Sequence, residues 1–217
     1  MNKVGPRTRV WDLPTRLFHW TLAALVIFSV VTIKLGGNWM EWHFRSGYAI
    51  LALVLFRLLW GFAGSRYARF ASFVRGPRAV ADYLRGRLAH GAGHNPLGGL
   101  SVLAMLALLL SQTGTGLFSN DGSYTEGPLA KLISGSLSNL LTSVHKAGEI
   151  ALYGLVGLHV AAIVYYAVAR RERLVPAMVT GDQPVDAPAA RDDLMLRLRA
   201  LLLLALCAGV VAFVVTR

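Results

Sequence analysis

The sequence predicts an all-α membrane protein: a four-helix transmembrane bundle followed by a fifth, C-terminal transmembrane helix. Two features indicate this fold. Of the 217 residues, 55% are hydrophobic and only 15% are charged, which is the composition of a membrane protein rather than of a soluble one. The hydrophobic residues also gather in five long runs. Because no run alternates apolar and polar residues, we expect no strands.

The predicted spans alternate with polar connections. The first span contains no charge, and the second is interrupted only by Arg57. In chain order the runs are Leu17 to Ile33, a run ending near Phe62, Pro96 to Phe118, Val144 to Ala169 and Ala200 to Thr216. We therefore expect a four-helix domain over residues 1–180, a cytoplasmic linker over 181–199 and an additional membrane helix over 200–217.

The long connection between the second and third spans contains one further element. The stretch Pro77 to Leu88 begins with proline, which suits the first turn of a helix. Its mixture of arginines and apolar residues predicts a short amphipathic helix at the membrane surface.

The charge distribution predicts the orientation of the chain. The formal net charge is +11, and the arginines cluster in alternate connections. By the positive-inside rule this places the N-terminus in the cytoplasm and, after five crossings, the C-terminus in the periplasm of a bacterial inner membrane. Because the positive charge follows the lipid boundary, we expect membrane lipid and not nucleic acid as its partner.

A single cysteine, Cys207, lies within the last apolar run. One cysteine excludes internal disulfides, iron–sulfur ligation and the C-x-x-C-H attachment of a c-type haem. Any haem in this protein is therefore expected to be held non-covalently.

Four histidines are the candidate ligands. His145 and His159 are fourteen residues apart in the fourth span, a rise of roughly 21 Å with a net rotation of about −40°, so both leave the same helix face. Ionisable residues at membrane depth are functional candidates by default. His19 lies at the same depth as His159, and His43 at the same depth as His145. Two bis-imidazole sites, one near each surface, would suit electron transfer across the membrane.

The alternative for each histidine is a hydrogen bond to a neighbouring helix, but four histidines matched in depth favour the paired interpretation. His90 and His94 lie in the glycine-rich stretch A-H-G-A-G-H-N-P. Because glycines disfavour a helix there, we expect a loop or interfacial role rather than a metal site.

Other residues are expected near the ligands. Gly47 and Gly148 share the ligand face, where they serve either the close approach of a macrocycle or tight helix packing. Arg57 shares the face of His43 and is expected to pair with a haem propionate, with snorkelling to the headgroups as the alternative. Glu149 either accepts a hydrogen bond from a ring nitrogen or lies in a quinone pocket. Lys146, Lys34 and Arg16 are further propionate candidates, although a location at the surface explains each equally well, and Asp12 is a candidate cap of the first helix.

Several motifs carry a family resemblance. They are V-W-D-L-P-T-R-L-F-H-W (Val10 to Trp20), W-H-F-R-S-G-Y (Trp42 to Tyr48), F-R-L-L-W-G-F (Phe56 to Phe62), G-H-N-P-L-G (Gly93 to Gly98) and the H-x13-H spacing of the fourth span. Over roughly the first 180 residues the chain resembles the bacterial di-haem cytochromes b of the b561 and nickel–iron hydrogenase b-subunit type.

The resemblance implies a four-helix core with two haems b, one ligated by His19 with His159 and the other by His43 with His145. It also implies electron exchange between the quinone pool and a partner redox protein. The G-H-N-P segment, with the D-G-x-Y and G-P-L-A pieces between Asp121 and Ala130, resembles a subgroup found with soluble c-type cytochromes. A periplasmic c-type cytochrome is therefore the expected partner.

Three other functions stay open at this point. The chain could act as a stand-alone haem oxidoreductase on a small oxidant or reductant such as superoxide at the outer haem. It could be the b-type anchor subunit of a hydrogenase-like complex. A non-redox scaffold or transporter that moves protons through its histidines is less favoured, because it requires fewer than four depth-matched imidazoles.

Overall fold

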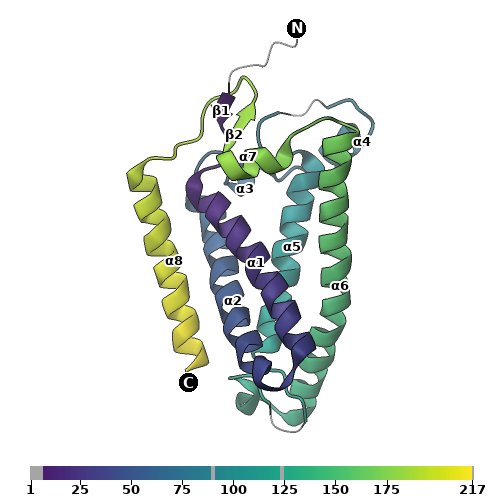
Figure 1. Cartoon of the computed structure of the whole chain (residues 1–217), viewed down its shortest axis with the longest axis vertical. Coiled ribbons are helices and arrows are strands. Elements are labelled where there is room, and N and C mark those ends of the chain that lie inside the picture. Colours follow the sequence, from purple (N-terminus) through teal and green to yellow (C-terminus); the bar gives the residue numbers. More distant parts are fainter. Residues whose placement is uncertain (1–6, 89–90, 123–124, 217) are drawn as a thin grey trace. The chain divides into compact units, whose positions relative to one another are not determined.

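A computed structural model describes residues 7–88, 91–122 and 125–216. Within these residues, five helices are long and apolar enough to cross a membrane. They are α1 (Leu13–Leu35), α2 (Met40–Ala63), α5 (Pro96–Gly116), α6 (Gly135–Val168) and α8 (Leu194–Val215), labelled in Figure 1. The five predicted spans are confirmed as helices.

Three helices begin earlier than their apolar runs, and α1 does so by four residues, at Leu13 rather than Leu17. At 34 residues, α6 is about 51 Å long, which exceeds the hydrocarbon core of roughly 30 Å. Its first turns, from Gly135 onward, are helical but too polar to belong to the apolar run. α8 begins at Leu194 rather than at Ala200, because Asp193 caps it by accepting a hydrogen bond from the Leu196 amide at 2.8 Å.

Shorter helices lie in the connections. α4 (Pro77–Leu84) begins with its proline in the first turn, which confirms the predicted helix, although it ends four residues before Leu88. The other short helices are α3 (Phe70–Phe73), α7 (Leu174–Thr180) and two 3₁₀ turns, Gly37–Trp39 and Ala130–Leu132.

The expectation that strands are absent is wrong in one place. β1 (Arg7–Arg9) pairs with β2 (Asp182–Pro184) as a two-stranded antiparallel ribbon, and the two lie side by side in Figure 1. Both strands lie outside the apolar runs, so hydrophobic periodicity could not predict them. The stretch expected to be a linker is thus hydrogen-bonded to the N-terminal segment over part of its length.

The chain forms two compact units. The first comprises the residues up to Phe18, Arg57–Ala104 and Leu158–Leu201. The second comprises His19–Phe56, Met105–Gly157 and the residues from Leu202 onward.

The core of the first unit forms around the start of α1. Val10 and Trp11 pack against Ala177 of α7, and Gly181 accepts hydrogen bonds from both of their amides, at 2.8 and 2.9 Å. Gly181 has a φ of 92°, and a Cβ there would meet the Trp11 carbonyl at 2.6 Å, so the position requires glycine. Asp12, fully buried, accepts a hydrogen bond from the Thr15 amide at 2.7 Å, which confirms that it caps α1.

The second unit has its own core. Leu51 and Ala52 of α2, Leu117 after α5, and Val211 of α8 form a buried cluster, against which Tyr48 packs. α8 therefore contributes to the same core as α2, the helix that carries His43, although the two helices are far apart in the sequence.

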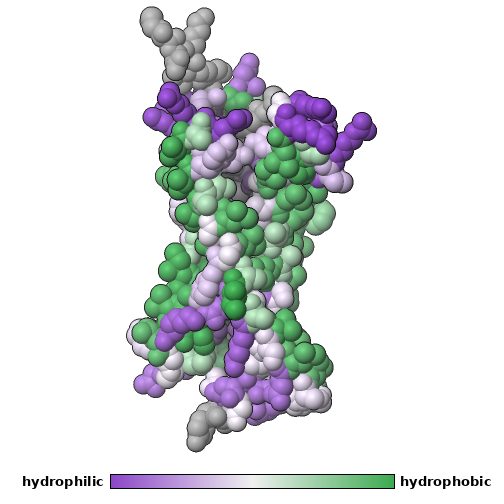
Figure 2. Space-filling model, turned by 90° about the vertical axis from the view of Figure 1, so that its right-hand side faces the viewer, coloured by the Kyte–Doolittle hydropathy of each residue, from purple (hydrophilic) through white to green (hydrophobic). Residues whose placement is uncertain are grey.

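The exposed surface of the long helices is apolar. On the face drawn in Figure 2, hydrophobic residues dominate along the helices and hydrophilic residues gather near their ends. Large hydrophobic side chains such as Ile27, Phe62 and Leu202 are exposed. Together with the five spans, this surface belongs to a multi-pass membrane protein.

Candidate functional site

His43 of α2 and His145 of α6 are brought together in the second unit. Their ring centres are 6.2 Å apart, and the ring planes are inclined at 82°. An iron between two imidazoles, with metal–nitrogen bonds of roughly 2 Å, would separate the ring centres by about 6 Å. The spacing therefore fits a haem iron ligated on both sides.

The hydrogen bonds of the two rings orient them for ligation. Nδ1 of His43 lies 3.0 Å from the carbonyl oxygen of Ser29, and Nδ1 of His145 lies 2.9 Å from that of Gln112. Because a carbonyl only accepts, each Nδ1 is assigned the proton and donates it, which leaves the lone pair on Nε2. Metal-binding histidines are typically held in this way.

Neighbouring hydroxyls add to this arrangement. Oγ of Ser29 lies 3.1 Å from Nδ1 of His43, and Oγ1 of Thr115 lies 3.4 Å from Nδ1 of His145. A Cβ at Gly116 would meet the His145 ring at 3.2 Å, so α5 approaches the ring closely there.

The two glycines predicted on the ligand face have different surroundings. A Cβ at Gly47 would meet no atom of the described chain within 4 Å, which leaves room for a flat group beside α2. A Cβ at Gly148 would collide with the Gln112 side chain. Helix packing thus accounts for Gly148, and its assignment to a haem site stays a prediction.

His19 and His159 belong to different units, so their pairing stays a prediction of the sequence. Both are half-buried. The His19 ring makes an edge-to-face contact with Trp20, with 5.0 Å between ring centres.

Arg57 lies in the first unit with a side chain that is only 3% exposed. Its guanidinium carbon is 5.2 Å from the centre of the Phe70 ring and 5.8 Å from that of Phe73. Asp12 attracts it electrostatically, yet Nη1 of Arg57 and Oδ2 of Asp12 have no hydrogen-bond partner among the described residues. This burial disagrees with snorkelling and leaves one guanidinium nitrogen available to an anion such as a propionate.

Glu149 does not bond to a histidine nitrogen in any described contact. Its Oε1 lies 2.5 Å from Nζ of Lys34 and accepts a hydrogen bond from Tyr153. Arg16 donates to the Val179 carbonyl at 2.6 Å, and Lys146 is exposed.

His94 packs between two aromatic rings, 4.6 Å from Trp11 and 4.7 Å from Phe73 between centres. This agrees with the expected loop role. His90 lies outside the described residues, as do residues 1–6.

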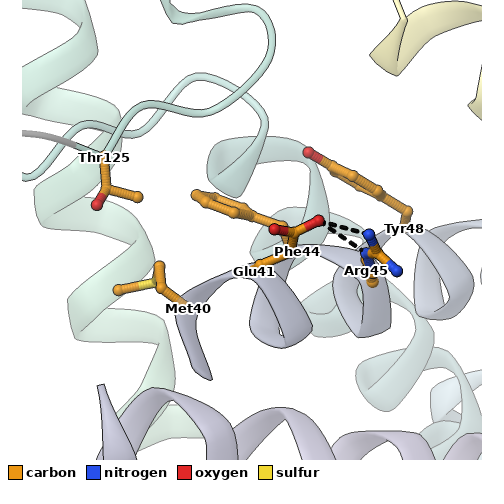
Figure 3. A pocket seen from close by; sticks show the side chains of 6 residues that line it. All are labelled: Met40, Glu41, Phe44, Arg45, Tyr48 and Thr125. Atoms are coloured by element: carbon orange, nitrogen blue, oxygen red, sulfur yellow. Dashed lines mark hydrogen bonds and ion pairs between the residues drawn. The ribbon is translucent and has the colours of Figure 1, made fainter. Parts of the chain in front are cut away.

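A cavity of about 410 Å³ opens beside the first turns of α2, lined by Met40, Glu41, Phe44, Arg45, Tyr48 and Thr125. Figure 3 shows its Glu41–Arg45 ion pair. Phe44 and Tyr48 are one and five residues after His43, about 100° and 140° around the helix from it. The cavity is therefore separate from the space between the two rings.

The chain is similar to known proteins over most of its length. Residues 10–181 match the family described as prokaryotic cytochrome b561. A protein of Bradyrhizobium diazoefficiens, named a probable Ni/Fe-hydrogenase B-type cytochrome subunit, is 23% identical over 214 residues, which cover 82% of this chain and 86% of that protein. No solved structure matches the chain. The chain belongs to the prokaryotic cytochrome b561 family, as a multi-pass membrane b-type cytochrome of electron transfer.

Proposed function

We propose that the protein transfers electrons between the quinone pool and a partner redox protein, a periplasmic c-type cytochrome, in a bacterial inner membrane. The observation that supports this most directly is the His43–His145 pair, with its 6.2 Å spacing and both Nδ1 atoms bonded to carbonyls. In this proposal His43 with His145 holds one haem b, and His19 with His159 holds a second.

The haems held by these histidines would supply one-electron chemistry at their iron. The task of this chain's residues is to hold and orient them. Ser29 and Gln112 fix the two rings through their carbonyls, and Gly47 leaves space beside α2. Arg57 offers a buried positive charge to a propionate.

The domain division is part of this proposal. Residues 1–180 would form the haem-binding domain, close to the matched range 10–181. Residues 181–199 would connect this domain to the additional membrane helix predicted over 200–217, of which residues 200–215 belong to α8.

The test is the haem content of purified protein with alanine at the histidines, measured from the reduced b-type absorption spectrum. The wild type should hold two haems per chain, and His145→Ala or His159→Ala should each hold one. The double variant at His43 and His145 should still hold one haem, whereas the double variant at His43 and His159 should hold none.

His94→Ala serves as the control, because His94 packs against the rings of Trp11 and Phe73 and belongs to neither proposed pair, and it should keep both haems. A T-shaped contact between two imidazoles would give the same ring spacing without a haem. A colourless wild type, or full haem content in His145→Ala, would contradict the proposal.

A second function is favoured by the printed name of the Bradyrhizobium protein. The chain would then anchor a hydrogenase-like complex and pass its electrons to quinone. Co-purification from the native membrane distinguishes the two, because a c-type cytochrome would accompany the chain in the first case and a hydrogenase large subunit in the second.

A further inference from the structure

A polar cluster lies at the surface of the second unit, apart from the histidine pair. Lys34 is in the last turn of α1, while Glu149 and Tyr153 are one turn apart on α6. Nζ of Lys34 is 2.5 Å from Oε1 of Glu149 and 5.9 Å from the centre of the Tyr153 ring. The Tyr153 hydroxyl donates to the same carboxylate oxygen.

The cluster keeps unused hydrogen-bonding capacity. Both contacts of Glu149 are made to Oε1, and Oε2 has no donor among the described residues. The Lys34 ammonium has three N–H groups, of which the ion pair with Glu149 takes one. The side chains are open to the surroundings, with exposed fractions of 61% for Lys34 and 29% for Glu149.

The position connects the cluster to the proposed haem site. Glu149 follows His145 by four residues, so the two share a face of α6 with their Cβ atoms about 6 Å apart. Val31, one turn before Lys34, and Ile150, next to Glu149, are exposed apolar side chains. A ligand at the cluster would therefore lie beside His145 and find apolar surface for a hydrocarbon tail.

The chemistry of the cluster favours a neutral head group. One carboxylate and one ammonium cancel in charge, and the open Glu149 oxygen would repel a lipid phosphate. A hydroxyl that donates to Oε2 and an oxygen that accepts from Lys34, on a ring that packs beside Tyr153, satisfy all three side chains.

We propose that Lys34, Glu149 and Tyr153 bind the head group of a lipid-soluble hydroquinone, with Glu149 accepting a hydrogen bond from a hydroxyl and Lys34 donating to an oxygen. This inference rests on the proposed function and identifies the quinone-side site within it.

The experiment measures binding of decylubiquinol to the full-length, haem-loaded protein by calorimetry without oxygen. The protein is reduced beforehand, so that binding is measured without electron transfer. Glu149→Gln keeps an acceptor for Lys34 but loses the charge, and Tyr153→Phe keeps the Lys34–Glu149 pair. We expect each variant to weaken binding, Glu149→Gln by roughly tenfold to a hundredfold. The decylubiquinol concentration for half-maximal haem reduction, starting from oxidised protein, should rise in parallel.

Glu41→Gln is the matched control, since Glu41 also pairs with a cation, Arg45, at 2.6 Å in the same unit. It should bind decylubiquinol as the wild type does. If both cluster variants bind like the wild type and only their thermal unfolding changes, the cluster is a structural ion pair and the proposed site is wrong. Equal weakening in Glu41→Gln would also overturn it. A wild type without a b-type spectrum would instead overturn the proposed function itself.

Discussion

Asp192 is a single carboxylate that joins three parts of the chain. Its side chain is only 7% exposed, and it accepts hydrogen bonds from Arg9 at 2.8 Å, from Arg197 at 3.1 Å and from the Leu13 amide at 3.1 Å. Burial raises the pKa of Asp192, but the hydrogen bonds from Arg197 and Leu13 outweigh it, and the net pKa lies below the usual value. The carboxylate therefore stabilises the folded chain only while it is ionised.

The pH dependence follows from that sign. Because the folded-state pKa is below the unfolded value of about 3.9, the contribution of Asp192 is complete above that value and is lost as the pH falls further. Asp192→Asn should lower stability by about 1–3 kcal/mol at pH 7, seen as a lower thermal unfolding temperature in detergent. The difference in unfolding temperature between the variant and the wild type should become small below about pH 4.

Asp186→Asn is the control for this substitution, because Asp186 is exposed in the same unit. It should change the unfolding temperature little at any pH. If the difference in unfolding temperature between Asp192→Asn and the wild type stays constant down to pH 3, the charge of Asp192 is not what stabilises the fold.

At the residue scale, the residues that could be predicted from the sequence are those whose side-chain type is unusual or informative at its position. His43 and His145 stand out because an imidazole is costly in an apolar helix, and Asp12 because it precedes a helix. The sequence did not predict Ser29 and Gln112 as ring-orienting residues, because they act through backbone carbonyls that every residue possesses. The one available signal was the polar run of residues 111–113 inside an apolar span.

At the scale of the element, glycines on α2 and α6 test where a flat cofactor lies. Gly47→Leu should lower haem content by about half, because the side chain would enter the open space beside α2. Gly154→Leu is the control: Gly154 is also open, but lies nine residues from His145, about half a turn around α6 from it. Haem per protein, from the reduced absorption spectrum, measures the difference; equal haem content in the two variants would place the cofactor elsewhere.

Substitution of Gly148 on α6 is expected to affect helix packing and stability rather than haem content. Gly148→Ala places a methyl group against the Gln112 side chain, which must move or force α6 away from α5. Because the contact is with the far end of a flexible side chain, we expect a loss of at most about 1 kcal/mol, measured by thermal unfolding. Gly154→Ala should be neutral or slightly stabilising, because alanine is the better helix former.

The elements themselves were predicted to different degrees. The long helices followed from runs of apolar residues, and α4 from its proline and its arginines. The start of α6 at Gly135 was missed, because its first turns are too polar to belong to a span. β1 and β2 were missed because three-residue strands have no local periodicity, and their pairing joins residues that are far apart in the sequence.

At the scale of the whole molecule, the prediction concerns orientation. Alkaline phosphatase fused after Arg217 should be active in a bacterial host, because the positive-inside rule predicts that the arginine-rich connections and the N-terminus are cytoplasmic, and five crossings would then place the C-terminus in the periplasm. The same enzyme fused after Asp193, before α8, should be inactive. Activities in the reverse order would contradict the predicted orientation.

The β1–β2 ribbon has a consequence for how the protein is made. The bond between Arg9 and Asp182 spans 173 residues, so at about 5–20 residues per second the ribosome needs on the order of ten to thirty seconds to deliver the second partner. During that interval β1 has no partner strand. The ribbon can therefore form only in a chain that has been translated past β2, and a nascent polypeptide stalled before that point lacks it.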